Sequence, residues 1–133
     1  MSELKLKIVT PDRVFFQGEI ISVTVRGVEG DFTILRNHAP FVTVIQISKM
    51  KIRTEEESRI AAISGGYITV KDNDIVIMSD ACEWADEIDM ERAEHAKQRA
   101  EKRLESVKGE KDVLNAELAL KRALNRLQTG QGK

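Results

Sequence analysis

Residues 86–103, DEIDMERAEHAKQRAEKR, mark the point at which the chain changes from a strand pattern to a helix pattern. The stretch begins with several acidic side chains, which cap the free amides of a first helical turn and suit the positive end of the helix dipole. At about 100° per residue, one narrow stripe of this helix consists of Ala93, Ala96, Ala100, Leu104 and Val107. The stretch therefore predicts a helix with one alanine-rich side, which a partner helix can approach closely.

Upstream of this stretch, residues 1–85 show the pattern of short β-strands. Segments such as LKLKIV, FVTVIQI and DIVIMS alternate or run apolar with β-branched residues, and turns such as GVEGD and KDNDI separate them. Each strand has an apolar face to bury, and two facing sheets bury both faces. We expect an all-β sandwich or flattened barrel, with a bend or bulge at the glycine pair 65–66.

Downstream of the first helix, Gly109 interrupts the pattern, and a second helix is expected from about Asp112 to Leu127. Two helices joined by a short link form a helical hairpin. The matching apolar stripe of the second helix consists of Val113, Ala116, Leu120, Leu124 and Leu127. Leu114 and Leu118 lie outside this stripe, so the second helix has more apolar surface than one antiparallel neighbour covers. The remainder must pack on the β-unit or on another protein.

The arginines of the first helix have fewer acidic neighbours than Lys97. Residues three or four apart on a helix touch, and Lys97 has a glutamate on each side within that reach. Arg99 and Arg103 have no carboxylate at either spacing, and Arg92 has only an aspartate three residues earlier. Two interpretations stay open. The row is either a solvated basic face, or a site for an anion with several oxygens, such as a phosphate chain or a partner's acidic segment.

Arg122 and Arg126 lie four residues apart on the second helix, beyond the last acidic residue of the chain, Glu117. Residues 118–133 therefore carry basic side chains only, Lys121 among them. A non-specific nucleic-acid binder would show a strongly basic domain and stacking aromatics, whereas the net charge here is −1 and the helical region has no aromatic residue. We expect an acidic protein surface or a nucleotide as the ligand, and no nucleic acid.

Length and composition exclude several classes of protein. The 133 residues, of which 41% are hydrophobic and 32% charged, suit one ordinary globular domain with at most an appendage. No stretch approaches the roughly 18 apolar residues of a membrane span, and the first residues lack a secretory signal, so we expect an intracellular soluble protein. The single cysteine, Cys82, is expected to be a structural thiol. No metal-ligand spacing, nucleophile–base pair or phosphate-binding glycine loop indicates a metal site or an enzyme.

Four segments, in this order and over almost the whole chain, resemble the epsilon subunit family of the bacterial rotary ATP synthase: ILRNHAPFV, ISGGY, DEIDMERA and ELALKRALNRL. The resemblance implies a ten-stranded β-sandwich at residues 1–85, which binds the rotor, and an antiparallel two-helix regulatory hairpin at residues 86–133. It also implies a non-catalytic subunit that binds the gamma subunit and the c-ring. Such a subunit lies at the cytoplasmic face of the bacterial cell membrane and meets the membrane only through its partners.

The chain resembles in particular the branch of this family whose members bind ATP. The pattern of that branch is Ile or Leu, Asp, two variable residues, Arg, Ala, and it is matched here by Ile88, Asp89, Arg92 and Ala93. Further positions that the family uses for nucleotide binding correspond to Glu83, Arg99, Arg122 and Arg126. The resemblance thus implies ATP as a regulatory ligand of the folded hairpin, with the presence of Mg²⁺ left open and no metal site of the protein's own.

The resemblance also implies how the hairpin regulates the enzyme. Extended helices are expected to reach the alpha and beta subunits of the catalytic head and to block ATP hydrolysis by obstructing rotation, whereas ATP favours the folded hairpin. The residues expected at contacts with partner subunits are Asp31, His38, Lys121, Arg122 and Arg126. On pattern alone, a stand-alone helical-hairpin adaptor or a nucleic-acid-binding module is the alternative.

A helical wheel limits how the arginines of the two helices meet. Arg122 and Arg126 lie roughly opposite the leucines of the predicted stripe. They reach a site shared with the arginines of the first helix only if another face, through Ala119 and Ala123, meets that helix. The convergence is therefore implied by the resemblance and does not follow from the periodicity.

Overall fold

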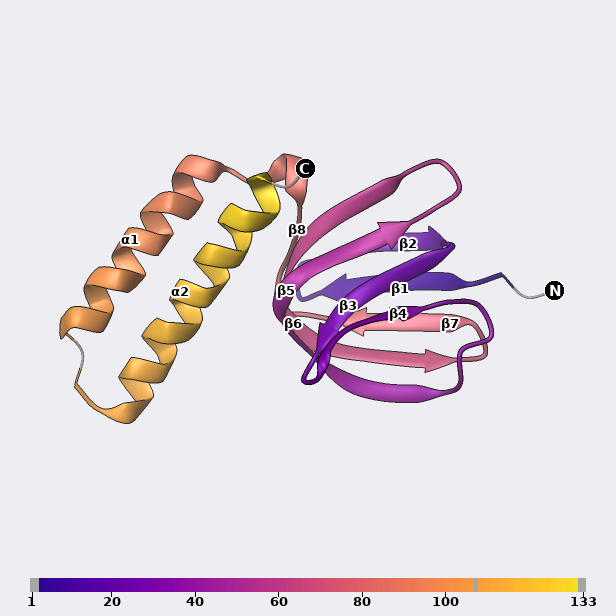
Figure 1. Ribbon diagram of the computed structural model, residues 1–133, viewed down its shortest axis with the longest axis horizontal. Coiled ribbons are helices and arrows are strands. Elements are labelled where there is room, and N and C mark those ends of the chain that lie inside the picture. Colours follow the sequence, from indigo (N-terminus) through magenta and orange to yellow (C-terminus); the bar gives the residue numbers. More distant parts are fainter. Residues whose placement is uncertain (1–2, 107, 132–133) are drawn as a thin grey trace. The chain divides into compact units, whose positions relative to one another are not determined.

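The computed structural model describes residues 3–106 and 108–131. The chain divides into two compact units, Met1–Trp84 and Ala85–Lys133, and each is described by itself. The strands, all in the first unit, are β1 (Lys5–Thr10), β2 (Arg13–Glu19), β3 (Ser22–Gly27), β4 (Gly30–Ile34), β5 (Phe41–Arg53), β6 (Ser58–Lys71), β7 (Asp74–Met78) and β8 (Cys82–Trp84). The second unit holds a short 3-10 helix, η1 (Ala85–Glu87), and two α-helices, α1 (Met90–Ser106) and α2 (Glu110–Gln131) (Figure 1).

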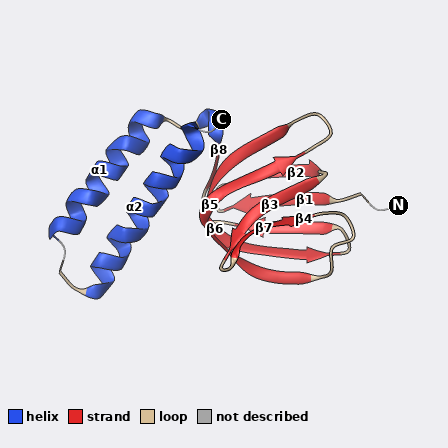
Figure 2. Ribbon diagram, in the orientation of Figure 1, coloured by secondary structure: helices blue, strands red, loops and turns tan. Residues whose placement is uncertain are grey.

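The long strands β5 and β6 connect the two layers of the first unit. The hydrogen-bonded order is β2-β1-β7-β6-β5-β3-β4, and β8 pairs with β6. The first half of β5 pairs with the second half of β6, which leads to β7, β1 and β2. The second half of β5 pairs with the first half of β6, and this part carries β3, β4 and β8. The described residues thus form eight strands and not the expected ten, because β5 and β6 each run through both layers (Figure 2).

The glycine pair in β6 provides the bend between these layers. Gly65 and Gly66 have φ angles of 80° and 143°, which L side chains rarely adopt. A Cβ on Gly66 would also collide with the backbone of the neighbouring strand β7. The pairing with β5 keeps one register across the pair, because Ile45 lies opposite Gly66 and Ile47 opposite Ser64. The feature is therefore a bend without an inserted residue, and not a bulge.

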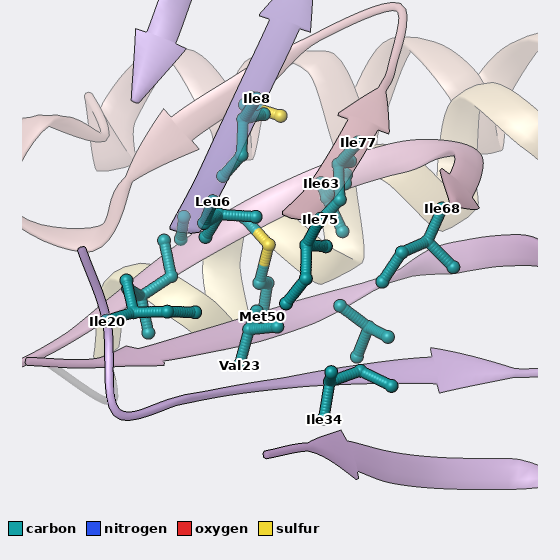
Figure 3. Packing of buried hydrophobic residues seen from close by; sticks show 14 of the residues in the cluster. Leu6, Ile8, Ile20, Val23, Ile34, Met50, Ile63, Ile68, Ile75 and Ile77 are labelled. Atoms are coloured by element: carbon teal, nitrogen blue, oxygen red, sulfur yellow. The ribbon is translucent and has the colours of Figure 1, made fainter. Parts of the chain in front are cut away.

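Alternate residues of the strands form the core of the first unit. In β1, Leu6 and Ile8 are buried, whereas Lys5 and Lys7 are exposed. Figure 3 shows aliphatic side chains from several strands gathered around Met50, which is itself fully buried. The period-2 pattern that predicted these strands therefore also predicted which of their faces is buried.

A bulge in β2 turns two consecutive phenylalanines toward one tryptophan. The pairing of β2 with β1 shifts by one residue at Phe15. Phe15 stacks on Trp84 with ring centroids 4.4 Å apart, and Phe16 meets the same ring edge-on at 6.1 Å. The guanidinium of Arg59 lies over the Trp84 ring, 3.6 Å from its centroid. These contacts fix the side chain of Trp84, which is the last residue of the first unit.

The two helices of the second unit form an antiparallel hairpin that packs along small residues (Figure 2). The buried residues of α1 are Ala93 and Ala100, and those of α2 include Ala116, Ala123 and Gly130, so each set has a seven-residue spacing. Ala100 and Ala116 are equally far along the chain from the middle of the connecting loop, and so are Ala93 and Ala123. An antiparallel pair of helices places residues at equal distances from the loop at about the same level. We call these residues the alanine seam.

The seam corrects the leucine stripe predicted for α2. Leu124 is 38% exposed, whereas Ala123 beside it is 2% exposed. Leu120 and Leu127 are half-buried. Alanine side chains allow two helix backbones to approach closely, and this favours the face that contains Ala123 over the face that contains Leu124. Val107, which was placed in the stripe of the first helix, lies outside the described residues.

Candidate functional site

Asp89 is the N-cap of α1. Its carboxylate oxygen Oδ1 accepts a hydrogen bond from the backbone amide of Arg92 at 3.1 Å, and its carbonyl oxygen accepts one from the amide of Ala93 at 3.0 Å. Capping by an acidic side chain, as the sequence predicted, is therefore confirmed at Asp89. Ile88 is 6% exposed and Ala93 is fully buried. These two members of the sequence pattern are thus buried on either side of the capped turn.

An open recess of about 480 Å³ lies over the first turns of α1. It is lined by Asp89, Glu91, Arg92, His95 and Arg99. Among residues 3–106 and 108–131, no carboxylate lies within ion-pair distance of Arg92 or Arg99, whereas Lys97 pairs with Glu94 at 3.8 Å. Two guanidinium groups beside carboxylates and an imidazole suit a ligand that carries both anionic oxygens and hydroxyl groups. The sequence analysis had placed neither His95 nor Glu91 in the site.

The remaining residues of the predicted nucleotide site are not among the lining residues of the recess. Arg122 is exposed and Arg126 half-buried on α2, on either side of the buried Ala123, and neither arginine is among the lining residues of the recess. The helical wheel allowed the arginines of the two helices to meet only if the face of α2 with Ala119 and Ala123 packs on α1. Ala123 is buried, so this condition is met at that residue. Glu83 is half-buried in β8 of the first unit, where it pairs with Ala62.

The predicted partner contacts occupy exposed turns of the first unit and the surface of α2. Asp31 pairs with Arg26 across the β3–β4 hairpin at 2.8 Å. The hydrogen bond and charge of Asp31 raise the pKa of Arg26, which stays charged. His38 lies in the loop between β4 and β5, half-buried, with its ring 5.5 Å from that of Phe41. Lys121 is exposed on α2.

The first unit also carries an exposed apolar face that the sequence analysis did not identify. Val44, Tyr67 and Met78 are direct neighbours on β5, β6 and β7, and they are 46%, 60% and 59% exposed. Val42, two residues before Val44 and on the same face of β5, is 69% exposed. We call these four residues the apolar face. A contiguous group of large exposed apolar side chains is typical of a protein-binding surface. The sequence does carry a sign of this face. The first residues of β5 are apolar at both odd and even positions, so both faces of the strand carry apolar side chains.

The remaining features of the described residues give no indication of a reactive thiol, a metal site or a membrane-spanning helix. Burial raises the pKa of the Cys82 thiol to about 11, so the thiol stays protonated and unreactive near neutral pH. No cluster of histidine, cysteine or acidic residues in the described part of the chain could hold a metal ion. None of the helices described is long and apolar enough to cross a membrane.

An apolar-faced β-sandwich followed by a helical hairpin with an arginine-lined recess defines a two-part binding protein. A family model for the ATP synthase Delta/Epsilon chain β-sandwich domain matches residues 3–85, and one for the Delta/Epsilon chain long α-helix domain matches residues 86–131. The chain is 48% identical to the ATP synthase epsilon chain of Alkaliphilus metalliredigens over 99% of its own length and 98% of that protein. It is 40% identical to the epsilon chain of Ruminococcus albus over the full length of both.

Solved structures share the fold at lower sequence identity. A chain of the Euglena gracilis mitochondrial ATP synthase superposes with a TM-score of 0.80 at 23% identity, over 92% of this chain and 78% of that one. A chain of the Tetrahymena thermophila mitochondrial ATP synthase central stalk and c-ring gives a TM-score of 0.73 at 15% identity, over 97% of each. At these identities the likeness shows the fold alone.

The protein belongs to the epsilon chain family of the bacterial ATP synthase, which confirms the resemblance found in the sequence. It is a non-catalytic subunit of the enzyme that couples ATP synthesis to proton transport.

Proposed function

We propose that this chain is a rotor subunit of the central stalk, in which the first unit binds the gamma subunit and the c-ring. Support comes from its likeness to a chain of the Tetrahymena central stalk and c-ring. The exposed apolar face gives that unit a surface that a partner protein can desolvate. The turns that carry Asp31 and His38 supply polar groups for the same purpose. The subunit is thereby held at the cytoplasmic face of the membrane through its partners.

The second unit binds ATP in its folded form. The observation that carries this proposal is the recess at the start of α1, where Arg92 and Arg99 lie together without carboxylate partners in the described residues. Planar guanidinium groups bind phosphate oxygens in pairs, and carboxylates such as that of Asp89 accept hydrogen bonds from ribose hydroxyls. Arg122 and Arg126 of α2 are the other members of the proposed set, with or without Mg²⁺.

The alanine seam makes the hairpin suitable as a switch. Burying a methyl group contributes about 0.8 kcal/mol, against roughly 1.5–3 kcal/mol for a leucine or valine side chain, so a seam of alanines holds two helices weakly. Such a hairpin opens at modest cost, and a ligand that binds only the closed form changes the balance. The weakly packed seam supports a role for this hairpin as the bistable element that the proposed regulation requires.

In the open state the hairpin inhibits ATP hydrolysis by obstructing rotation. Lys121, Arg122 and Arg126 lie on a stretch of α2 that has no acidic residue after Glu117. Such a basic surface docks on acidic segments of the alpha and beta subunits, with long-range attraction that falls as salt rises. ATP in the closed form and the catalytic head in the open form then compete for some of the same arginines.

The test is the affinity of the full chain for ATP, measured by calorimetry for three variants. Arg92→Ala and Arg99→Ala remove guanidinium groups of the recess and should each weaken binding at least tenfold, which is about 1.4 kcal/mol. Lys97→Ala is the matched control, because that lysine already pairs with Glu94. An equal loss in all three variants would mean that ATP binds by charge alone and would overturn the proposed site.

A further inference from the structure

Two asparagines in left-handed backbone join two separate turns of the first unit. Asn37, in the loop between β4 and β5, has a φ of 68°, and Asn73, in the turn between β6 and β7, has a φ of 65°. The backbone amide of Asn37 donates a hydrogen bond to Oδ1 of Asn73 at 2.6 Å. In return, Nδ2 of Asn73 donates to Oδ1 of Asn37 at 3.4 Å. The β4–β5 loop is thereby attached to a turn far away in sequence.

Asn73 is itself held to the sheet. Its carbonyl oxygen accepts a hydrogen bond from the amide of Lys5 at 2.8 Å, at the start of β1. The turn before β7 is tight, because Asp72 also has a positive φ, of 52°. Two-residue turns of this kind take asparagine and aspartate readily and leave little freedom to the flanking strands. Asn73 is therefore a fixed point from which a loop can be positioned.

The loop between Leu35 and Pro40 has its own internal order. The amide of His38 donates to the carbonyl of Leu35 at 3.3 Å. Nδ1 of His38 lies 2.7 Å from the carbonyl oxygen of Ala39. Because a carbonyl only accepts, Nδ1 carries the proton, and Nε2 is left for another partner. The contact with Asn73 sets the direction in which this ordered loop points.

The contact with Asn73 orders the loop but contributes little to the stability of the fold. The hydrogen bonds that join Asn37 and Asn73 are exposed, and exposed hydrogen bonds contribute little to the stability of a core. A left-handed backbone is strained at a residue other than glycine, although asparagine tolerates it better than most residues. An arrangement that stabilises the fold so little, and yet fixes one loop conformation, suits a recognition loop.

We infer that Asn73 is a positioning residue for partner recognition by the Arg36–Pro40 loop. The inference rests on the proposed function, since it takes the partner to be the ATP synthase assembly that lacks this chain. Asn73 acts through Asn37, and the loop side chains make the contact. Preorganising a binding loop raises affinity by reducing the entropy that is lost on binding.

Three variants of the full chain separate positioning from folding. Asn73→Gly keeps the positive φ of the turn and removes only the side chain. Asn73→Asp keeps the acceptor oxygen for the Asn37 amide and tolerates the same backbone. Asp72→Gly is the matched control, because it adds the same backbone freedom to the same turn at a position that also has a positive φ, and it leaves the Asn73 side chain in place.

The first measurement is hydrogen exchange of the Asn37 amide, and the second is the Kd for an ATP synthase assembly reconstituted without this chain. Asn73→Gly should speed exchange at Asn37 and raise the Kd between about twofold and tenfold, with little change in melting temperature. Asn73→Asp and Asp72→Gly should stay close to the parent in both measurements. Rescue by the aspartate variant is the signature of positioning through one acceptor oxygen.

Two results would overturn the inference. Exchange at Asn37 that is unchanged in Asn73→Gly would show that the side chain does not hold the loop. Faster exchange with an unchanged Kd would show that the loop's order does not matter for recognition. If the parent chain itself failed to bind the assembly, the proposed function would fall, while exchange at Asn37 would still decide whether Asn73 holds the loop.

Discussion

Gly130, in the last turn of α2, lies so close to Met90 at the start of α1 that a Cβ on the glycine would collide with the methionine sulfur. The same added atom would lie 3.5 Å from Ile88. Gly130 also continues the seven-residue spacing of the alanine seam. The close approach of the two helices at the open end of the hairpin therefore favours a residue without a side chain at this position.

The first prediction is that Gly130→Ala loosens the closed hairpin by about 1–2 kcal/mol, because an added methyl group overpacks the contact. The gain in helix propensity is small this close to the helix end, and part of the strain is relieved if the Met90 side chain shifts. The measurement is hydrogen exchange at the Ala123 amide. Adding Met90→Ala to this variant should recover protection, and Gln128→Ala, at an exposed position, is the control. Parent-like exchange in Gly130→Ala would refute the steric account.

The second prediction compares the two phenylalanines beside Trp84. Phe15 is 8% exposed and stacked on the indole, so Phe15→Ala should destabilise the first unit by about 3–5 kcal/mol. Phe16 is half-buried and touches the ring only by an edge, so Phe16→Ala should cost clearly less. Trp84 is the one tryptophan of the chain, and its fluorescence reports denaturant unfolding directly. Equal losses in the free energy of unfolding would show that the stacking of Phe15 on Trp84, which the bulge makes possible, does not stabilise the first unit.

The third prediction concerns pH. Burial is the chief cause that raises the pKa of Cys82 from the ordinary thiol value of 9.0 to about 11. Below about pH 9 the thiol is neutral in both the folded and the unfolded chain. Between about pH 9 and pH 11 only the unfolded thiol ionises, so the free energy of unfolding falls as pH rises, by of order 2 kcal/mol. This loss should be absent from Cys82→Ala, and the difference between the two pH profiles is the measurement. Parallel profiles would contradict it.

The fourth prediction tests the apolar face. Tyr67→Lys places a charge in the middle of a surface that the partner desolvates, and it should weaken binding to the assembly that lacks this chain by at least tenfold. Ser58→Lys adds the same charge at an exposed position on β6 outside the face, and it should have little effect. The Kd of each variant is compared with that of the parent. A similar loss in both variants would point to net charge as the cause.

Local patterns predicted most of the fold. Alternation identified the strands because one face of each is buried, and the acidic cap and Gly109 identified the helix boundaries to within a few residues. The number of strands could not be predicted, because whether Gly65 and Gly66 end a strand or bend it depends on how β6 packs on β7. The prediction of which face of α2 is buried was wrong at Leu124, because two closely packed helices have room for alanine between them and not for leucine.

The candidate site was predictable in part. Arg92 and Arg99 were found from sequence because the lack of acidic neighbours along one helix is a local property. The link between Asn37 and Asn73 was not, because it joins turns that only the sheet brings together. Val44, Tyr67 and Met78 escaped notice for a related reason: an apolar row across three strands is visible only once their register is known.

The most direct test of the central claim is hydrogen exchange at Ala93 and Ala123, the two ends of one level of the alanine seam, in the full chain as ATP is added. If ATP binds only the closed hairpin, exchange at both amides should slow by a factor of 1 + [ATP]/Kd, which is about tenfold at ten times the Kd. The slowing should be lost in Arg99→Ala and kept in Lys97→Ala. Exchange that stays constant while ATP binds would show that the nucleotide does not hold the hairpin closed, and it would contradict the account.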